Sequence, residues 1–130
     1  MIHIAICDDE PLHRERLADD VRRHLPEQAC SLQLFESPSA LLDAIVEHGC
    51  TPNIAILDIQ MDEMSGIELA KRINAVLPQC AIIFATSYLG FATDVYETEH
   101  AYFILKREFE QRIGAALEKA LALFYPVCAK

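Results

Sequence analysis

The stretch Asn-Ile-Ala-Ile-Leu-Asp at residues 53–58 is a short, almost continuous apolar run that ends in a carboxylate. Residues 2–7, Ile-His-Ile-Ala-Ile-Cys, have the same character and lead directly into Asp8, Asp9 and Glu10. Runs of this kind, rich in β-branched residues, are typical of strands that are buried on both faces of a parallel sheet. We therefore predict two such strands, each of which ends in an acidic side chain.

Three further apolar runs, at residues 31–35, 81–85 and 101–105, predict three more strands. Polar residues again follow the runs: Thr86 comes after the fourth strand and Lys106 after the fifth. All five predicted strands are short and continuously apolar, which is typical of a parallel sheet covered by helices on both faces.

The segments between and after the strands have helical features. Apolar residues recur at four-residue spacing, and Pro11 and Pro38 stand where a first helical turn favours proline. Helices are predicted over residues 11–25, 38–48, 67–77, 91–96 and 109–124. Strands that alternate with helices indicate an α/β domain of (βα)5 type: a doubly wound, five-stranded parallel sheet with helices on both faces.

Composition agrees with one compact domain over residues 1–130, since 52% of the residues are apolar and 24% are charged. Eleven basic and twenty acidic residues give a formal charge of −9, which disfavours direct contact with nucleic acid or anionic membranes.

The five cysteines never form a CxxC spacing, so we predict no zinc site and treat them as small core residues. We expect a cytoplasmic protein, because residues 2–7 are too short for a leader or a membrane span.

The polar residues at the strand ends are Asp8, Asp9, Asp58, Thr86 and Lys106. In a doubly wound sheet these ends meet at one edge, where ligands bind. Clustered carboxylates repel one another unless a cation joins them, and hard oxygen ligands suit Mg²⁺. The lysine and threonine can hold phosphoryl oxygens. The sequence therefore predicts metal-assisted phosphoryl transfer, with Asp58 as the nucleophile.

Each of these residues also has a simpler explanation. Residues 8–10 can be a solvated helix cap, and Asp58 can be a turn residue. Thr86 can bond to the backbone of a turn, and Lys106 can be a surface lysine. Only the combination at four strand ends favours the phosphoryl site.

Residues 4–11, 56–66, 82–87 and 103–106 together resemble the receiver domain of two-component response regulators, whose fold is flavodoxin-like and CheY-like. The resemblance covers essentially the whole chain. It implies that Asp58 accepts a phosphoryl group from a sensor histidine kinase.

The same resemblance assigns the neighbouring residues. It implies that Asp9 and Asp58 bind Mg²⁺ directly, that Asp8 assists through water, and that the Gln60 backbone carbonyl is a further ligand. Thr86 and Lys106 are expected to bind the phosphoryl oxygens. Phe103 corresponds to the aromatic switch residue of the family, which moves together with Thr86.

Residues 87–96 and 101–103 further resemble receivers that precede LytTR-type DNA-binding domains. This implies an output domain beyond Lys130 that contacts DNA and controls transcription. The aromatic and aliphatic residues around the fourth and fifth strand-helix units form a candidate surface for a homodimer. These residues are Tyr88, Phe91, Val95, Tyr96, Tyr102 and Phe103.

The chain departs from the family pattern at two places. Arg107 stands where a proline usually follows the lysine, and Asp62 stands where a proline usually follows the methionine. A cis bond without proline costs about 2.5 to 4 kcal/mol, so the Lys106–Arg107 peptide is either trans or strained.

Four histidines, His13, His24, His48 and His100, are expected to be surface or loop residues without a function.

A phosphorylation-independent interaction module on the same fold is the alternative function. Phosphatases of the haloacid dehalogenase type need a second aspartate at the position of Gln60, and flavin phosphate would be repelled by residues 8–10. Because the protein is its own substrate in phosphoryl transfer, we do not predict an enzyme.

Overall fold

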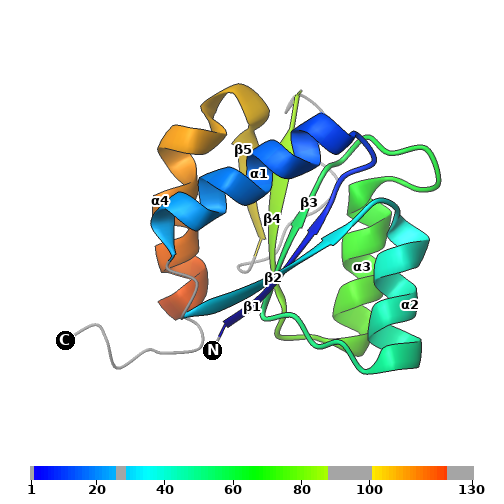
Figure 1. Cartoon of the computed structure of the whole chain (residues 1–130). Helices are drawn as coiled ribbons and strands as arrows, with labels where there is room; N and C mark the ends of the chain where they lie inside the picture. Colours follow the sequence, from blue (N-terminus) through cyan, green and yellow to red (C-terminus); the bar gives the residue numbers. More distant parts are fainter. Residues whose placement is uncertain (1, 26–28, 88–100, 123–130) are drawn as a thin grey trace.

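The computed structural model describes residues 2–25, 29–87 and 101–122. Its five strands form one parallel sheet in the order β2-β1-β3-β4-β5 (Figure 1). The strands are β1 (Ile2–Cys7), β2 (Cys30–Phe35), β3 (Ile54–Leu57), β4 (Ala81–Thr86) and β5 (Ala101–Leu105). The predicted parallel sheet is confirmed, and each strand begins and ends within one or two residues of the expected positions.

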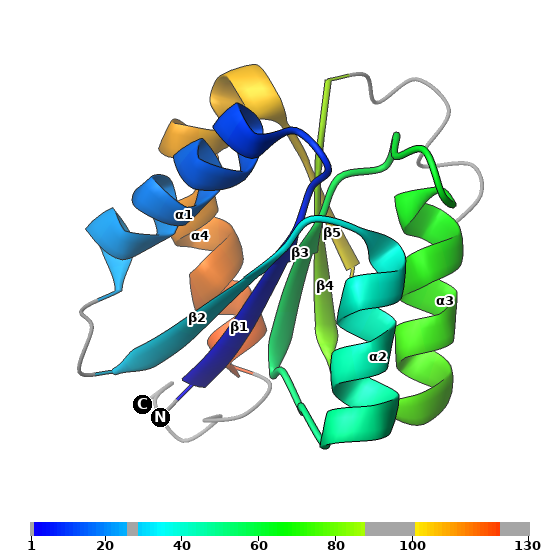
Figure 2. The same ribbon diagram turned by 45° about the vertical axis from the view of Figure 1, so that its right-hand side comes forward.

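Within the described ranges, four α-helices cover the two faces of the sheet. They are α1 (Pro11–His24), α2 (Pro38–His48), α3 (Gly66–Val76) and α4 (Phe109–Ala122), and the 3₁₀ turn η1 (Lys106–Glu108) leads into α4. Figure 2 shows α1 and α4 together on one side of the sheet and α2 and α3 on the other. The doubly wound α/β fold is therefore confirmed, whereas the helix predicted at residues 91–96 lies outside the described residues.

Local signals in the sequence explain where α2 and α3 begin and end. The Ser37 hydroxyl accepts a hydrogen bond from the Ala40 backbone N–H, and Pro38 occupies the first turn of α2. Gly49 ends α2 in a left-handed conformation, with φ of 71°. Ser65 caps α3 in the same way as Ser37 caps α2, through the Glu68 N–H.

Each face of the sheet carries its own apolar core. The first core lies between the sheet and α1 and α4, and the second lies between the sheet and α2 and α3. Every residue of β3 and β4 is buried, as expected for central strands covered on both sides. The strand order reverses between β1 and β3, and this is the place where doubly wound sheets bind their ligands.

Candidate functional site

The carboxyl ends of β1 and β3 bring three aspartates together. Cys7 and Leu57 are partners in the sheet, and the Asp58 N–H donates to the Cys7 carbonyl at 3.1 Å. Asp8, Asp9 and Asp58 each offer a carboxylate oxygen, and these oxygens lie within 4.8 Å of one another. Asp8 is 0% and Asp58 is 5% exposed. Carboxylates this close and this buried require compensation by positive charge.

The two oxygens of Asp8 have different surroundings. Oδ1 accepts a hydrogen bond of 2.9 Å from the Glu10 backbone N–H. Oδ2 is buried and has no hydrogen-bond partner among the described residues. It lies 3.0 Å from Lys106 Nζ, within ion-pair distance but without the alignment of a hydrogen bond. Oδ2 therefore retains lone pairs that a cation can use, and the donor set of three carboxylates fits a hard metal ion.

Asp58 is the carboxylate that its surroundings perturb most clearly. Burial raises the pKa of Asp58, and the charge of Asp8 raises it further. The Lys106 ammonium, 3.4 Å from Asp58 Oδ2, and a hydrogen bond from the Gln60 backbone oppose this rise in pKa. The ionised form of Asp58 is thus held in a poorly solvated pocket by one nearby cation.

The loop that follows β3 is fixed by backbone contacts. The Asp62 N–H donates to Asp9 Oδ2 at 3.1 Å, a bond that a proline at this position could not make. The Gly66 N–H donates to the Ile59 carbonyl at 2.8 Å. A side chain at Gly66 would overlap the backbone carbonyl of Asp58. Glycine at this position lets α3 start directly against the Asp58 backbone.

The other predicted site residues follow β4 and β5. Thr86 is fully buried at the end of β4, where it pairs in register with Leu105. Lys106 follows Leu105 directly, so the threonine and the lysine lie at neighbouring strand ends. No peptide bond in the described ranges is cis, and the Lys106–Arg107 bond is accordingly trans. Arg107 can thus follow the lysine without the cost of a non-proline cis bond.

Phe103 lies on β5 against its register partner Phe84 on β4. The two rings are stacked, with centroids 4.8 Å apart and planes inclined by 21°. Phe84 is buried, whereas Phe103 is half-buried. Most of the aromatic surface predicted for a homodimer, including every member at residues 88–100, lies outside the described residues.

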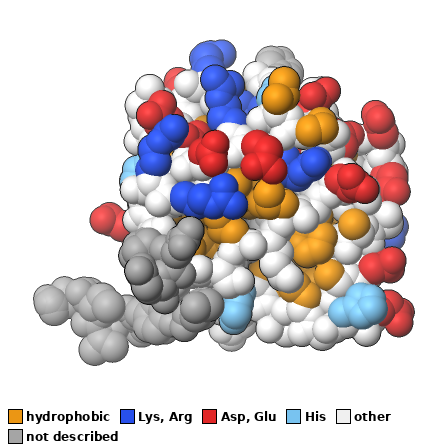
Figure 3. Space-filling view, in the orientation of Figure 1, with side chains coloured by type: hydrophobic (Ala, Val, Ile, Leu, Met, Phe, Trp, Pro, Cys, Tyr) orange, Lys and Arg blue, Asp and Glu red, His pale blue; other side chains and the backbone are white. Residues whose placement is uncertain are grey.

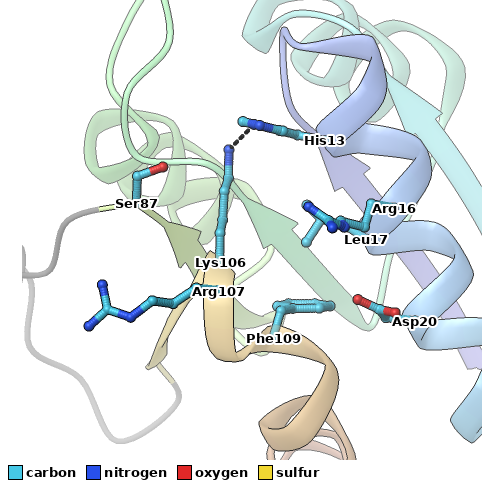
Figure 4. A pocket seen from close by; sticks show the side chains of 8 residues that line it. All are labelled: His13, Arg16, Leu17, Asp20, Ser87, Lys106, Arg107 and Phe109. Carbon is cyan, nitrogen blue, oxygen red and sulfur yellow. Dashed lines mark hydrogen bonds between the residues drawn. The ribbon is translucent and has the colours of Figure 1, made fainter.

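His13 belongs to this site, although the sequence had indicated no role for it. Its Nδ1 atom lies 2.8 Å from Lys106 Nζ, which is hydrogen-bond distance (Figure 4). His13 stands in the first turn of α1, close in sequence to the two aspartates that follow β1. That position was the available signal, because the start of α1 and the end of β5 meet at the same edge of the sheet.

A cavity of about 250 Å³ lies beside the lysine, between α1 and the start of α4 (Figure 4). Basic side chains line much of it, including Arg16 and Arg107 in addition to Lys106 and His13. Arg107 itself points away from α1 in this view. Figure 3 shows Lys and Arg side chains gathered over the part of the molecule where α1 and α4 lie, while acidic side chains predominate on the side of α2 and α3. The cavity beside Lys106 is thus lined by several basic side chains in a chain of net charge −9.

Two buried cysteines of the described residues, Cys7 and Cys80, carry thiols with a raised pKa. Burial raises the pKa of Cys7, next to Asp8, to about 12, and it raises the pKa of Cys80 to about 12 as well. Both thiols are therefore neutral and poorly nucleophilic. They pack in the core between the sheet and α2 and α3, as predicted for small apolar residues.

None of the described helices has the length and apolar character that crossing a membrane requires.

Residues 4–118 match the response regulator receiver domain family. The chain is 30% identical over 119 residues to the sensory transduction protein LytT of Enterococcus faecalis, covering 92% of this chain and 48% of LytT. It is 34% identical over 122 residues to the transcriptional regulatory protein BtsR of Escherichia coli, covering 94% of this chain and 47% of BtsR. The chain therefore spans about half the length of these relatives.

Solved structures agree on the fold. The receiver domain protein of Clostridium thermocellum superimposes with a TM-score of 0.81 at 18% identity, covering 98% of this chain and 99% of that one. The response regulator TrrA of Thermotoga maritima, solved in complex with Mg²⁺-BeF, superimposes with a TM-score of 0.73 at 24% identity, covering 92% of this chain and 99% of that one. The matched residues include every strand end that carries the acidic cluster, Thr86 and Lys106. This chain belongs to the receiver domains of two-component response regulators, the phosphoacceptor domains of these signalling systems.

Proposed function

We propose that Asp58 is the phosphoacceptor of this receiver and takes its phosphoryl group from the phosphohistidine of a sensor histidine kinase. The observation that carries the proposal is the pairing of Asp58 with Lys106: a 5% exposed carboxylate faces an ammonium 3.4 Å away. The phosphoryl group that a nucleophile receives needs a cation beside it. Lys106 supplies this cation at Asp58.

Mg²⁺ is the cofactor that the donor set supports. Asp9 and Asp58 are its proposed direct carboxylate ligands, the Gln60 carbonyl is a further ligand, and Asp8 assists through water. Support comes from the three oxygens within 4.8 Å of one another and from the buried Asp8 Oδ2, which has no hydrogen-bond partner within the described part of the chain. When bound, the ion supplies positive charge that neutralises the carboxylates and the phosphoryl oxygens.

The protein's own residues carry out the transfer in one balanced step. A carboxylate oxygen of Asp58 attacks the phosphorus in line, so that a new O–P bond forms. The P–N bond to the kinase imidazole breaks, and its electron pair remains on the imidazole nitrogen. Lys106 and the hydroxyl of Thr86 hold the phosphoryl oxygens as charge builds up on them.

The added phosphoryl charge is proposed to act as a switch. Thr86 is drawn towards the phosphoryl oxygens and leaves space that Phe103 can enter. The Phe103 ring, stacked on Phe84, is suited to such a movement because it is only half-buried. The surface formed by the fourth and fifth strand-helix units then changes shape. A homodimer through this surface is part of the same proposal.

The output is proposed to be transcription, through a LytTR-type DNA-binding domain beyond Lys130. Support comes from the relatives, which are about twice as long as this chain and include a transcriptional regulatory protein. The charge of −9 on this chain leaves DNA contact to the other domain.

Intact-mass measurement after incubation with acetyl phosphate and Mg²⁺ tests the proposal. One added phosphoryl group is expected, and it should be absent when EDTA removes the metal or when Asp58 is changed to Asn. A folded protein that gains no phosphoryl group at any donor concentration would favour the phosphorylation-independent interaction module.

A further inference from the structure

The ammonium of Lys106 faces three acceptors at the edge of the sheet. His13 Nδ1 lies 2.8 Å from Nζ, Asp8 Oδ2 lies 3.0 Å away, and Asp58 Oδ2 lies 3.4 Å away. The histidine contact is the shortest of the three and is a hydrogen bond, whereas Asp8 Oδ2 interacts with the ammonium through charge alone. His13 therefore contributes, through a hydrogen bond, to the direction of the lysine side chain.

The chemistry of the two groups fixes the form of the imidazole. An ammonium has three N–H donors and no acceptor, so His13 Nδ1 must accept the hydrogen bond. This hydrogen bond therefore requires the tautomer of His13 that carries its proton on Nε2. His13 is thus the one uncharged member among the three acceptors of Lys106.

A neutral acceptor is useful here because both carboxylates change during the proposed reaction. Asp58 becomes an acyl phosphate, and Asp8 and Asp58 are both assigned to the metal site. His13 takes part in neither change. It stands on α1, outside the cluster of three carboxylates. Neither change therefore removes the acceptor that His13 offers to Lys106.

A lysine needs such a restraint more than other cations do. Its flexible stem loses rotamer entropy when it is fixed, and its charge acts at a single point. Lys106 is 14% exposed, so water remains a competitor for its protons. A group that is already held where the charge develops lowers the barrier more than one that must be ordered during the reaction.

We propose that His13 is a positioning residue for Lys106: its Nδ1 holds the ammonium beside Asp58, ready to bind the incoming phosphoryl oxygen. This proposal rests on the proposed function and adds a residue to it. It predicts that His13 acts on the rate of phosphoryl transfer through the lysine, and not on the binding of Mg²⁺.

The test compares His13→Leu with His13→Asn. Leucine has a similar volume and no acceptor, whereas the asparagine Oδ1 can take the place of the imidazole Nδ1. His48→Leu, at an exposed position in the last turn of α2, is the matched control. The rate of phosphorylation by acetyl phosphate is measured by intact mass, against donor concentration at saturating Mg²⁺. The Mg²⁺ concentration at half-saturation, called the Mg²⁺ midpoint below, is measured in a separate titration.

His13→Leu is expected to lower the maximal rate about tenfold or more, the effect of losing a hydrogen bond to a charged group, with an unchanged Mg²⁺ midpoint. His13→Asn is expected to restore most of the rate, and His48→Leu to match the parent. A parental rate in His13→Leu overturns the inference, and so does an equal loss in His13→Asn. If the parent itself is not phosphorylated, the proposed function fails instead.

A second measurement does not depend on whether the His13→Leu variant folds. The nitrogen resonances of the imidazole rings are recorded in the ¹⁵N-labelled parent, and those of His13 are assigned by their loss in His13→Asn. The hydrogen bond predicts a neutral ring with its proton on Nε2. A ring with its proton on Nδ1 cannot accept from Lys106 and would overturn the inference.

Discussion

Lys106 Nζ lies 3.4 Å from Asp58 Oδ2 although the two residues follow strands that are not neighbours in the sheet. Asp58 follows β3, Lys106 follows β5, and β4 lies between them. The long lysine side chain therefore reaches across the end of β4, where Thr86 is buried. This reach brings one positive charge to a group of carboxylates that would otherwise repel one another.

Replacing Lys106 should separate two roles of this lysine: competition with Mg²⁺ for the carboxylates, and binding of the phosphoryl oxygens. Lys106→Gln is expected to strengthen Mg²⁺ binding several-fold, because an ammonium no longer competes for the same carboxylates. The same variant should be phosphorylated at least tenfold more slowly, since the phosphoryl oxygens lose a cation. Calorimetric titration with Mg²⁺ and intact-mass kinetics measure the two effects. Arg72→Gln, at an exposed position on α3, serves as the control and should change neither. Weaker Mg²⁺ binding in Lys106→Gln would contradict the competition described here.

The raised pKa of Asp58 predicts how stability depends on pH. Burial is its first cause, so the folded state binds the Asp58 proton more tightly than the unfolded state does. The stability that this group contributes is present below its ordinary pKa, near 3.8, and is lost as the pH rises through the raised value in the folded protein.

Asp58→Asn, which cannot ionise, should therefore be more stable than the parent at neutral pH when EDTA is present. The advantage should shrink as the pH is lowered towards 4. Urea unfolding at several pH values measures the difference. An advantage that grows as the pH falls would mean that the Asp58 pKa is lowered in the folded protein.

Mg²⁺ should stabilise the folded chain by about 2.7 kcal/mol at a concentration one hundred times its Kd. Asp9→Asn removes a proposed ligand charge but keeps an oxygen to accept from the Asp62 N–H, which donates to Asp9 at 3.1 Å in the parent. We expect it to weaken Mg²⁺ binding at least tenfold, about 1.4 kcal/mol. Asp19→Asn, at an exposed position on α1, should bind as the parent does. Thermal unfolding at graded Mg²⁺ concentrations compares the three proteins, and an equal response of all three would place the ion elsewhere.

Gly66→Ala should damage the site as well as the fold, because the added Cβ would overlap the Asp58 carbonyl. Relief of such an overlap costs about 1 to 3 kcal/mol and must shift the backbone of Asp58. Gly49→Ala is the comparison, since φ of 71° costs an alanine about 1 to 2 kcal/mol while nothing lies within 4 Å. Both variants should lose stability in urea, but only Gly66→Ala should be phosphorylated slowly. Equal phosphorylation of the two would show that the close approach of α3 does not position Asp58.

Much of this fold could be predicted because its signals are local. Apolar runs at residues 2–7 and 53–58 mark strands that are buried on both faces, and the carboxylates that follow them meet as soon as the strands are parallel. The helix predicted at 67–77 begins one residue earlier, at Gly66, because Ser65 and not a later residue supplies the cap. Shifts of this size reflect competition among adjacent backbone hydrogen bonds at helix ends.

The contacts that could not be predicted depend on how separate elements pack. Whether His13 reaches Lys106 depends on the angle at which α1 crosses the sheet, and no periodicity in the sequence encodes that angle. The bond from the Asp62 N–H to Asp9 depends in the same way on the path of the loop after β3. Both contacts depend on the packing of elements and not on the position of a strand end, and both were missed for that reason.

The central claim is that the phosphoryl group is carried on Asp58. The most direct measurement is reduction of the acetyl phosphate-treated parent with borohydride, which converts an aspartyl phosphate to homoserine, followed by peptide mass spectrometry. The predicted result is homoserine at position 58, dependent on Mg²⁺ and absent from the untreated protein. Unchanged Asp58 in a protein that has gained a phosphoryl group elsewhere, or has gained none, would contradict the account.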